Sequence, residues 1–116
     1  MNRRYPLTDE HDIQIRDDTE EGAYVIDVDG TRAGKAEYLM RDGRHIFTHT
    51  EVDEDFSGEG LASKLTKFAL DDVRERGGQV VPLCPFFAAY IQRHPDYEDL
   101  VDREMTMEIK KRRKRS

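Results

Sequence analysis

Two Asp-Gly pairs divide the first half of the chain into stretches rich in β-forming residues. Asp29-Gly30 and Asp42-Gly43 are the dipeptide that most favours a tight two-residue hairpin. The stretches that flank them are rich in Val, Ile, Tyr, Phe and Thr, and they cover 23–28, 31–40 and 45–52. The pattern predicts a three-stranded antiparallel meander. Gly34 marks a bulge within it, and the alternation Ile13-Gln14-Ile15 predicts a further short strand.

The hydrophobic period changes after Gly60. Apolar side chains then recur at spacings of three and four, as on one face of a helix, at Leu61, Ala62, Leu65, Phe68, Ala69 and Val73. Gly77-Gly78 ends this helix, and 80–83 reads as a short buried strand. A second helix begins at Pro85 and stops at His94-Pro95. The order predicts an α+β domain with a mixed sheet.

Length and composition limit the class of protein. The 116 residues suffice for one domain with one core, and no apolar run approaches the roughly 20 residues of a membrane helix. Cys84 is the single cysteine, so no internal disulfide is available. The first residues lack the apolar stretch of a signal peptide. We therefore expect a cytoplasmic protein.

The basic residues are concentrated at the C-terminus. Residues 110–116 carry six of the 19 basic residues, and the preceding 109 residues carry all 25 acidic ones. We expect three parts: a flexible N-terminus (1–10), a folded domain (11–109) and a disordered basic tail (110–116). The acidic body argues against nucleic acid as its partner, because phosphate would be repelled. The tail remains open: it could bind nucleic acid or an acidic surface, or fold back on the body.

The segment from Ser57 to Ala62 is a candidate phosphate site. Gly58 and Gly60 lie where a loop enters a helix, and the free N–H groups of a first helical turn bind anions. Without a lysine in the turn, it is not a nucleoside-triphosphate loop. The other interpretation of a bare Gly-x-Gly is an ordinary loop before a helix.

Four motifs in order resemble the small single-domain branch of the GNAT acetyltransferase superfamily. They are His49-Thr50-Glu51-Val52, Gly58 to Leu65, Pro82 to Phe86, and Tyr90 with His94-Pro95. The resemblance covers about residues 11–101. It implies acetyl-CoA or CoA as the bound co-substrate, without a metal. It also implies that the strand ending at Val52 splays from the strand near 80–83, with the pantetheine arm in the gap.

The resemblance implies that the cofactor contacts Val52, Ser57, Gly58, Glu59, Gly60, Leu61, Ala62 and Ser63. Two positions depart from the family pattern. Asp55 stands where the wider superfamily has Gln or Arg, and Ser57 where the small branch often has a basic residue. Both departures remove positive charge near the pyrophosphate. The N-terminal helices that shape the acceptor pocket of larger relatives have no counterpart.

Four residues are candidates for catalysis. Tyr90 lies near the position of the tyrosine that acts as acid in larger relatives, or it is a core aromatic. Cys84 precedes a helix N-terminus, which favours a thiolate that could accept the acyl group, or it is a small buried hydrophobe. His49 and Glu51 share one strand face and could act as the base if that face lines the cleft. His45 would join them if no bulge intervenes. One strand cannot converge three ligands, so we predict no metal site.

The sequence therefore predicts an acyl-CoA-dependent N-acyltransferase that modifies a small-molecule or protein amine. The alternative is a non-catalytic acyl-CoA-binding or regulatory module, which would need the glycine turn but not Cys84 or Tyr90.

Overall fold

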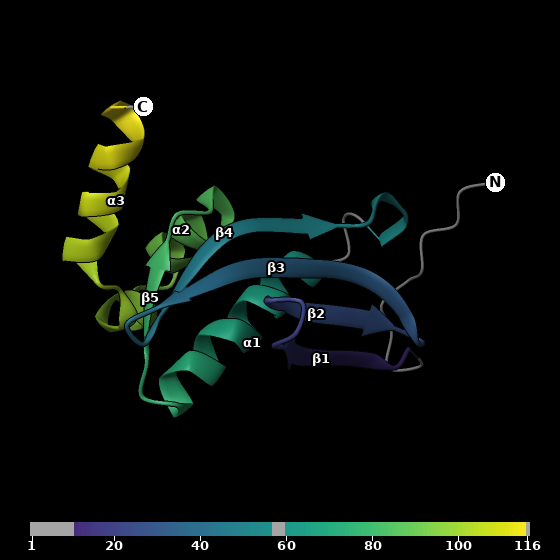
Figure 1. Cartoon of the computed structure of the whole chain (residues 1–116). Coiled ribbons are helices and arrows are strands. Elements are labelled where there is room, and N and C mark those ends of the chain that lie inside the picture. The colour runs from purple at the N-terminus through teal and green to yellow at the C-terminus, as the bar shows by residue number, and fades with distance from the viewer. Residues whose placement is uncertain (1–10, 57–59, 116) are drawn as a thin grey trace.

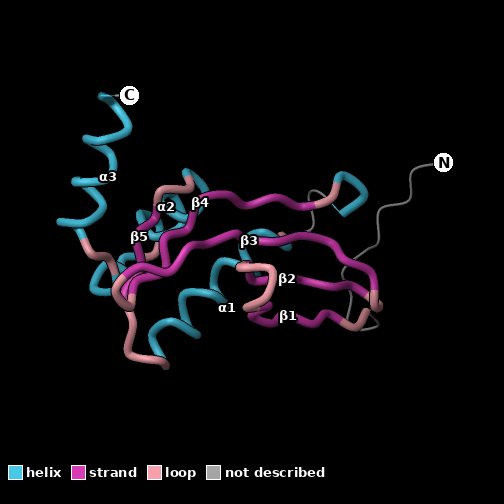
Figure 2. Tube along the Cα trace, viewed as in Figure 1, coloured by secondary structure: helices cyan, strands magenta, loops and turns pink. Residues whose placement is uncertain are grey.

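The computed structural model describes residues 11–56 and 60–115. Five strands form one sheet in the order β1-β2-β3-β4-β5, and α1 crosses one of its faces (Figure 1). The first four strands are antiparallel neighbours, whereas β5 runs parallel to β4. Figure 2 shows the same arrangement with the helices in cyan and the strands in magenta. The predicted α+β fold with a mixed sheet is confirmed. None of the described helices is long and apolar enough to cross a membrane.

The predicted hairpins are present at both Asp-Gly pairs. The strands are β1 (Ile13–Asp18), β2 (Ala23–Val28), β3 (Thr31–Arg41) and β4 (Arg44–Val52). Both residues of each turn have positive φ, at 51° and 82° for Asp29 and Gly30 and at 49° and 78° for Asp42 and Gly43. Positive φ at both central residues is what a type I′ turn requires, and Asp and Gly tolerate it best.

Two irregularities bend the sheet. The register between β2 and β3 shifts after Ile26, beside the predicted bulge at Gly34. The register between β3 and β4 shifts at Glu37/Tyr38, so that Glu37 lies opposite His49 and Tyr38 opposite Phe47. Because side chains alternate along a strand, one extra residue reverses which face each later side chain occupies. This second bulge decides how the end of β4 is presented.

The core lies between the sheet and the helices. Helix α1 (Leu61–Glu75) buries Leu61, Leu65, Ala69 and Val73 of the predicted apolar face, whereas Phe68 is 38% exposed. Gly77 ends the helix with φ of 72°. Helix α2 (Pro85–Arg93) follows β5 (Gln79–Pro82). Phe47 of β4 and Phe87 of α2 are both fully buried, and their rings stack with centroids 4.1 Å apart. Two short 3-10 helices, Glu54–Phe56 (η1) and Pro95–Leu100 (η2), complete the fold.

The basic end of the chain differs from the prediction. We expected disorder over 110–116, but residues 110–115 form the last turns of α3 (Arg103–Arg115). Arg, Lys, Glu and Met are strong helix formers, and Arg112 pairs with Glu108 one turn earlier at 3.0 Å. Residues 1–10 and Ser116, including the predicted flexible N-terminus, lie outside the described residues.

Asp102 fixes the start of α3 to the sheet. Its Oδ1 accepts the N–H of Met105 at 2.9 Å, which caps the helix. Its Oδ2 lies 2.9 Å from Nε of Arg44 on β4, and its own N–H donates to the carbonyl oxygen of Val80 on β5. The hydrogen bond from Met105, foremost, and that from Arg44 hold the pKa of Asp102 below its usual range.

Asp102→Ala should lower the unfolding free energy by about 1 kcal/mol through the lost cap, and it should reduce the helicity of α3. The pKa of Asp102 is lower in the folded protein than in the unfolded chain. The carboxylate's contribution to the unfolding free energy is therefore complete above about pH 4 and is lost as pH falls through the folded pKa. Urea unfolding and circular dichroism measure both effects. Asp96→Ala, on an exposed aspartate of η2, is the control. Unchanged helicity in Asp102→Ala would contradict the anchoring role.

Gly34→Ala should destabilise the fold by about 1–3 kcal/mol. A Cβ at this position would lie 2.7 Å from the carbonyl oxygen of Glu51, so β3 and the end of β4 would have to separate. Without that clash, replacing glycine by alanine should stabilise a strand. A loss of stability would therefore be evidence for the clash. Thermal unfolding measures the effect. Thr31→Ala, on an exposed position of the same strand, should change stability by less than about 0.5 kcal/mol.

Candidate functional site

Strands β4 and β5 part halfway along β4. They pair from Arg44 opposite Gln79 to Phe47 opposite Pro82. The last backbone hydrogen bond between them in the described structure is that from the N–H of Cys84 to the carbonyl oxygen of Phe47, at 2.8 Å. Beyond it β4 continues to Val52, whereas the chain after β5 turns into α2 (Figure 1). We call the opening between residues 48–52 and the start of α2 the fork.

Part of the β4 backbone faces the fork. The N–H of Asp53 donates to the carbonyl oxygen of Ala33 on β3 at 2.7 Å. In an antiparallel pair, backbone groups point alternately toward and away from the partner strand. The register from Gly34/Val52 to Glu37/His49 contains no shift. The backbone groups of Thr50 and Val52 therefore point away from β3, toward the side where β5 would otherwise pair.

The N-terminus of α1 presents backbone N–H groups that have no acceptor among the described residues. Gly60 adopts a left-handed conformation with φ of 73° and ψ of 14°, and no side chain in the described part of the chain caps the helix. The first intrahelical bond runs from Lys64 N–H to Gly60 O, at 3.1 Å. The amides of 61–63 therefore lie at the positive end of the helix dipole, with no acidic residue in the first turn. Ser57, Gly58 and Glu59 lie outside the described residues.

Cys84 borders the fork. It is the residue before α2, its side chain is buried, and its Sγ lies 3.2 Å from Oγ1 of Thr50. The bulge in β3 and β4 explains this contact, since it turns Thr50 toward the helices instead of the opposite face. Of the four predicted catalytic residues, Cys84 is the one whose side chain contacts Thr50 on the helix-covered side of the fork.

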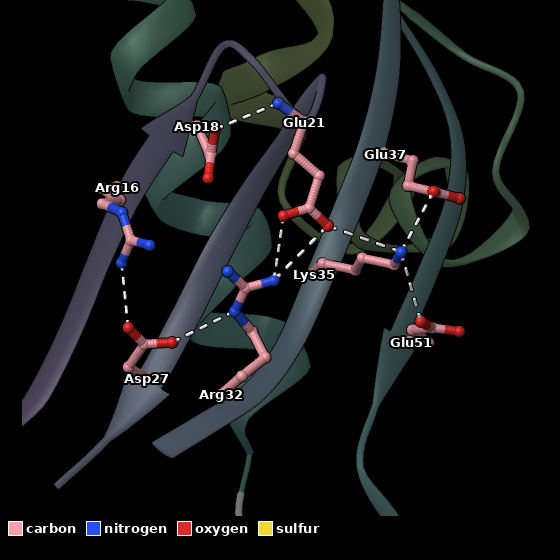
Figure 3. A network of polar contacts seen from close by, with 8 residues as sticks. All are labelled: Arg16, Asp18, Glu21, Asp27, Arg32, Lys35, Glu37 and Glu51. Carbon is pink, nitrogen blue, oxygen red and sulfur yellow. Dashed lines mark hydrogen bonds and ion pairs between the residues drawn. The ribbon is translucent and has the colours of Figure 1, made fainter. Parts of the chain in front are cut away.

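His49 and Glu51 lie together on the opposite face of β4. Nε2 of His49 is 3.1 Å from Oε2 of Glu51, and both side chains are 54% exposed. Glu51 also faces Lys35, which carries ion pairs to Glu37 and Glu21 as well (Figure 3). The prediction that these two residues share a face is correct. That face belongs to the polar side of the sheet, away from α1.

Tyr90 lies on another side of α2. Its ring stacks on His94 at 4.0 Å between centroids and lies 6.1 Å from the ring of Tyr97. It lines a recess of about 710 Å³ between α1, α2 and η2, together with Lys67, Arg74 and Arg93. Tyr90 follows Cys84 by six residues, about 240° around the helix axis. The structure therefore turns the two side chains in different directions.

Comparison with known proteins assigns the family. The family model of the GCN5-related N-acetyltransferases matches residues 23–100, two thirds of the chain. The chain belongs to this family. Its fold is similar to the NMR solution structure of a GCN5-like protein from Staphylococcus aureus, with a TM-score of 0.58 and 21% identity over 81% of this chain and 90% of the other. No curated protein sequence matches the chain significantly.

Two features of this N-acetyltransferase-family site were missed from sequence. The motif that contains Thr50 does not indicate a role for this residue, because its contact with Cys84 depends on the bulge. Lys64 is exposed in the first turn of α1. It places a positive charge beside the free amides, where Asp55 and Ser57 supply none. The amide cluster and the cationic side chain fit a phosphate-bearing ligand of the kind the family binds.

His45 does not belong to the site. The bulge intervenes, so His45 lies on the face opposite His49 and is only 5% exposed among the rings of Tyr24, Tyr38 and Phe47. Its Nδ1 has no hydrogen-bond partner among the described residues. Burial lowers the pKa of His45, while the charges of Asp17 and Asp72 oppose this shift and that of Arg76 adds to it.

His45 should make the fold less stable as pH falls below about 6.5, the ordinary histidine pKa. There the unfolded chain binds a proton that the folded chain resists, so unfolding is favoured by up to about 1.4 kcal/mol per pH unit. His45→Phe should weaken this dependence. Urea unfolding at about pH 7.5 and about pH 5.5 tests it, with His49→Gln as the exposed control. Equal pH dependence in the wild type and His45→Phe would contradict the assignment.

Proposed function

We propose that this chain is an acyl-CoA-dependent N-acyltransferase, with acetyl-CoA as the donor and a small-molecule or protein amine as the acceptor. The observation that carries the proposal is the fork, which opens next to Cys84 while the uncapped N-terminus of α1 offers phosphate donors. Family membership supports the reaction class.

The polyphosphate end of the donor would be held by α1. The amides of Leu61, Ala62 and Ser63 carry no side-chain cap, and the left-handed turn at Gly60 has open space around its Cα. Ser57, Gly58 and Glu59 remain part of the proposed cradle on the strength of the motif. Because Asp55 and Ser57 provide no positive charge, backbone donors and Lys64 would dominate this contact.

The amide-containing arm of the donor would pair with β4. The outward backbone groups of Thr50 and Val52 offer a donor and an acceptor each, as a missing strand would require. When bound, acyl-CoA supplies a thioester whose carbonyl carbon an amine can attack. An arm extended along β4 toward Phe47 would bring that end of the donor to Cys84.

Cys84 and α2 would form the reacting end of the site. The N–H of Cys84 is already bonded to Phe47, and Pro85 has no N–H. The amides of Phe86 and Phe87 follow at the positive end of α2, which no side chain caps. Backbone donors at such an end stabilise negative charge that develops on a carbonyl oxygen. We assign Cys84 as the side chain that contacts the thioester.

His49 and Glu51 are the proposed base for the acceptor amine. Their exposed face is reachable by a bulky substrate, and Oε2 of Glu51 lies 3.1 Å from Nε2 of His49, which holds the imidazole ring in position. Tyr90 is retained as the proposed acid. The ring of Tyr90 packs beside those of His94 and Tyr97. This orientation is the observation that favours the second candidate, a non-catalytic acyl-CoA-binding module.

Acetyl-CoA at about 100 times its dissociation constant should stabilise the protein by about 2.7 kcal/mol. Lys64→Gln should weaken the affinity several-fold, because it removes a charge beside the phosphate cradle. Lys67→Gln is the matched control on the same helix, since Lys67 is paired with Asp71 at 2.8 Å. Differential scanning fluorimetry with acetyl-CoA, longer acyl-CoAs and CoA measures the shifts. No shift with any CoA species would overturn the proposed function.

Turnover distinguishes the two candidate functions. Cys84→Ala, Tyr90→Phe and His49→Gln should each lower the rate of acetyl transfer to a polyamine or lysine peptide by at least about tenfold, while retaining the acetyl-CoA thermal shift. A retained shift without turnover in the wild type, across a panel of amines, would favour the binding module. Intact mass after incubation with acetyl-CoA alone shows whether Cys84 carries the acyl group.

A further inference from the structure

The last two turns of α3 form a cationic rod. From Lys110 to Arg115 every residue is Lys or Arg, and the side chains from 110 to 114 are exposed. The carboxylates of α3, Glu104 and Glu108, lie in its first half. Arg112 pairs with Glu108, whereas Lys110, Lys111 and Lys114 form no ion pair within the described part of the chain.

The charge surrounds the helix on every side. Successive residues of an α-helix are rotated by about 100°, so the five exposed cations from 110 to 114 already cover the whole circumference. A flat acidic protein surface could contact only one side of such a rod. A groove walled by phosphates on both sides could contact several sides at once.

The fold holds this rod away from the body. Asp102 ties the start of α3 to β4 and β5, and Thr106, one turn in, is still buried. From there α3 rises past β5 and α2, and its last turns extend beyond the other elements to the C-terminus (Figure 1). The anchor lies at the start of α3. The cationic side chains at the other end are therefore carried on a formed helix and remain exposed to solvent.

The body and the rod carry opposite charge. Residues 1–109 contain 13 basic and 25 acidic residues, a net charge of −12, against +6 on 110–116. Phosphate is therefore repelled by the body and attracted by the rod alone. A projecting helix resolves this conflict, since it can engage a polyanion while the acidic domain stays outside the groove.

We propose that α3 binds duplex DNA by lying in the major groove and contacting phosphates on both sides. The major groove of B-DNA is about 12 Å wide and admits an α-helix. Since the contacts that we propose are to phosphates, which carry no sequence information, the binding is independent of sequence. The inference goes beyond acyl transfer and does not rest on it.

Fluorescence anisotropy with a labelled mixed-sequence DNA duplex of about 20 bp, a length we choose to exceed one helical turn, tests the proposal on the full chain. If all six cations contact phosphates, the slope of log K against log salt should be about −5. Lys110→Gln/Lys111→Gln should reduce the slope by about 2. Gln is a good helix former, and circular dichroism checks that α3 persists.

The matched control is Arg41→Gln/Arg93→Gln, which removes the same charge from exposed positions on the body and should leave binding unchanged. Equal weakening by both pairs would overturn the proposal. So would equal affinity for duplex RNA, whose deep and narrow major groove excludes a helix, or stronger binding to polyglutamate. A further outcome would also overturn it: self-association without DNA that salt weakens and that the α3 variant loses. That result would mean that α3 binds the acidic body of a second copy of the chain. Cys84→Ala should bind DNA normally, so this test and that of the proposed function fail independently.

Discussion

The hydrogen bond from the N–H of Cys84 to the carbonyl oxygen of Phe47 is where the parallel pairing of β4 and β5 ends. Phe47 also stacks on Phe87, so the same residue ends the pairing through its backbone and holds α2 in place through its ring. If the pairing continued, the backbone groups of Thr50 and Val52 would be consumed by β5 and no fork would exist. The proposed donor site depends on this interruption.

The bulge at Glu37/Tyr38 supplies the second constraint. It leaves His45 and Phe47 in the core, sends His49 and Glu51 to the polar face, and turns Thr50 toward Cys84. A regular strand would present His45 with His49 and would move Thr50 away. One additional residue in a strand thus separates a buried imidazole from an exposed one and completes the wall of the fork.

Sequence reasoning succeeded where local conformation decides the structure. The turns at Asp29-Gly30 and Asp42-Gly43 follow from the ease with which these residues adopt positive φ, and α1 follows from its apolar spacing. The position of the bulge depends on packing between distant segments, so the face of His45 was not predictable. The helix over 110–115 was not predicted, because a run of like charge is typical of a disordered tail, although Asp102 is a recognisable cap. The roles of Cys84, Tyr90, His49 and Glu51 stay predictions, since contacts alone do not establish chemistry.

The polar face of the sheet explains how so hydrophilic a chain folds. Val25 is fully buried, yet its neighbours across β1 and β3 are Arg16 and Lys35, and the face around it carries the ion pairs of Figure 3. The hydrocarbon stems of such side chains can cover apolar surface while their charged ends remain in water. The mean hydropathy of −0.86 scores these side chains as charged, although their methylene groups cover one face of the sheet. It therefore understates how much apolar surface the fold packs away from water.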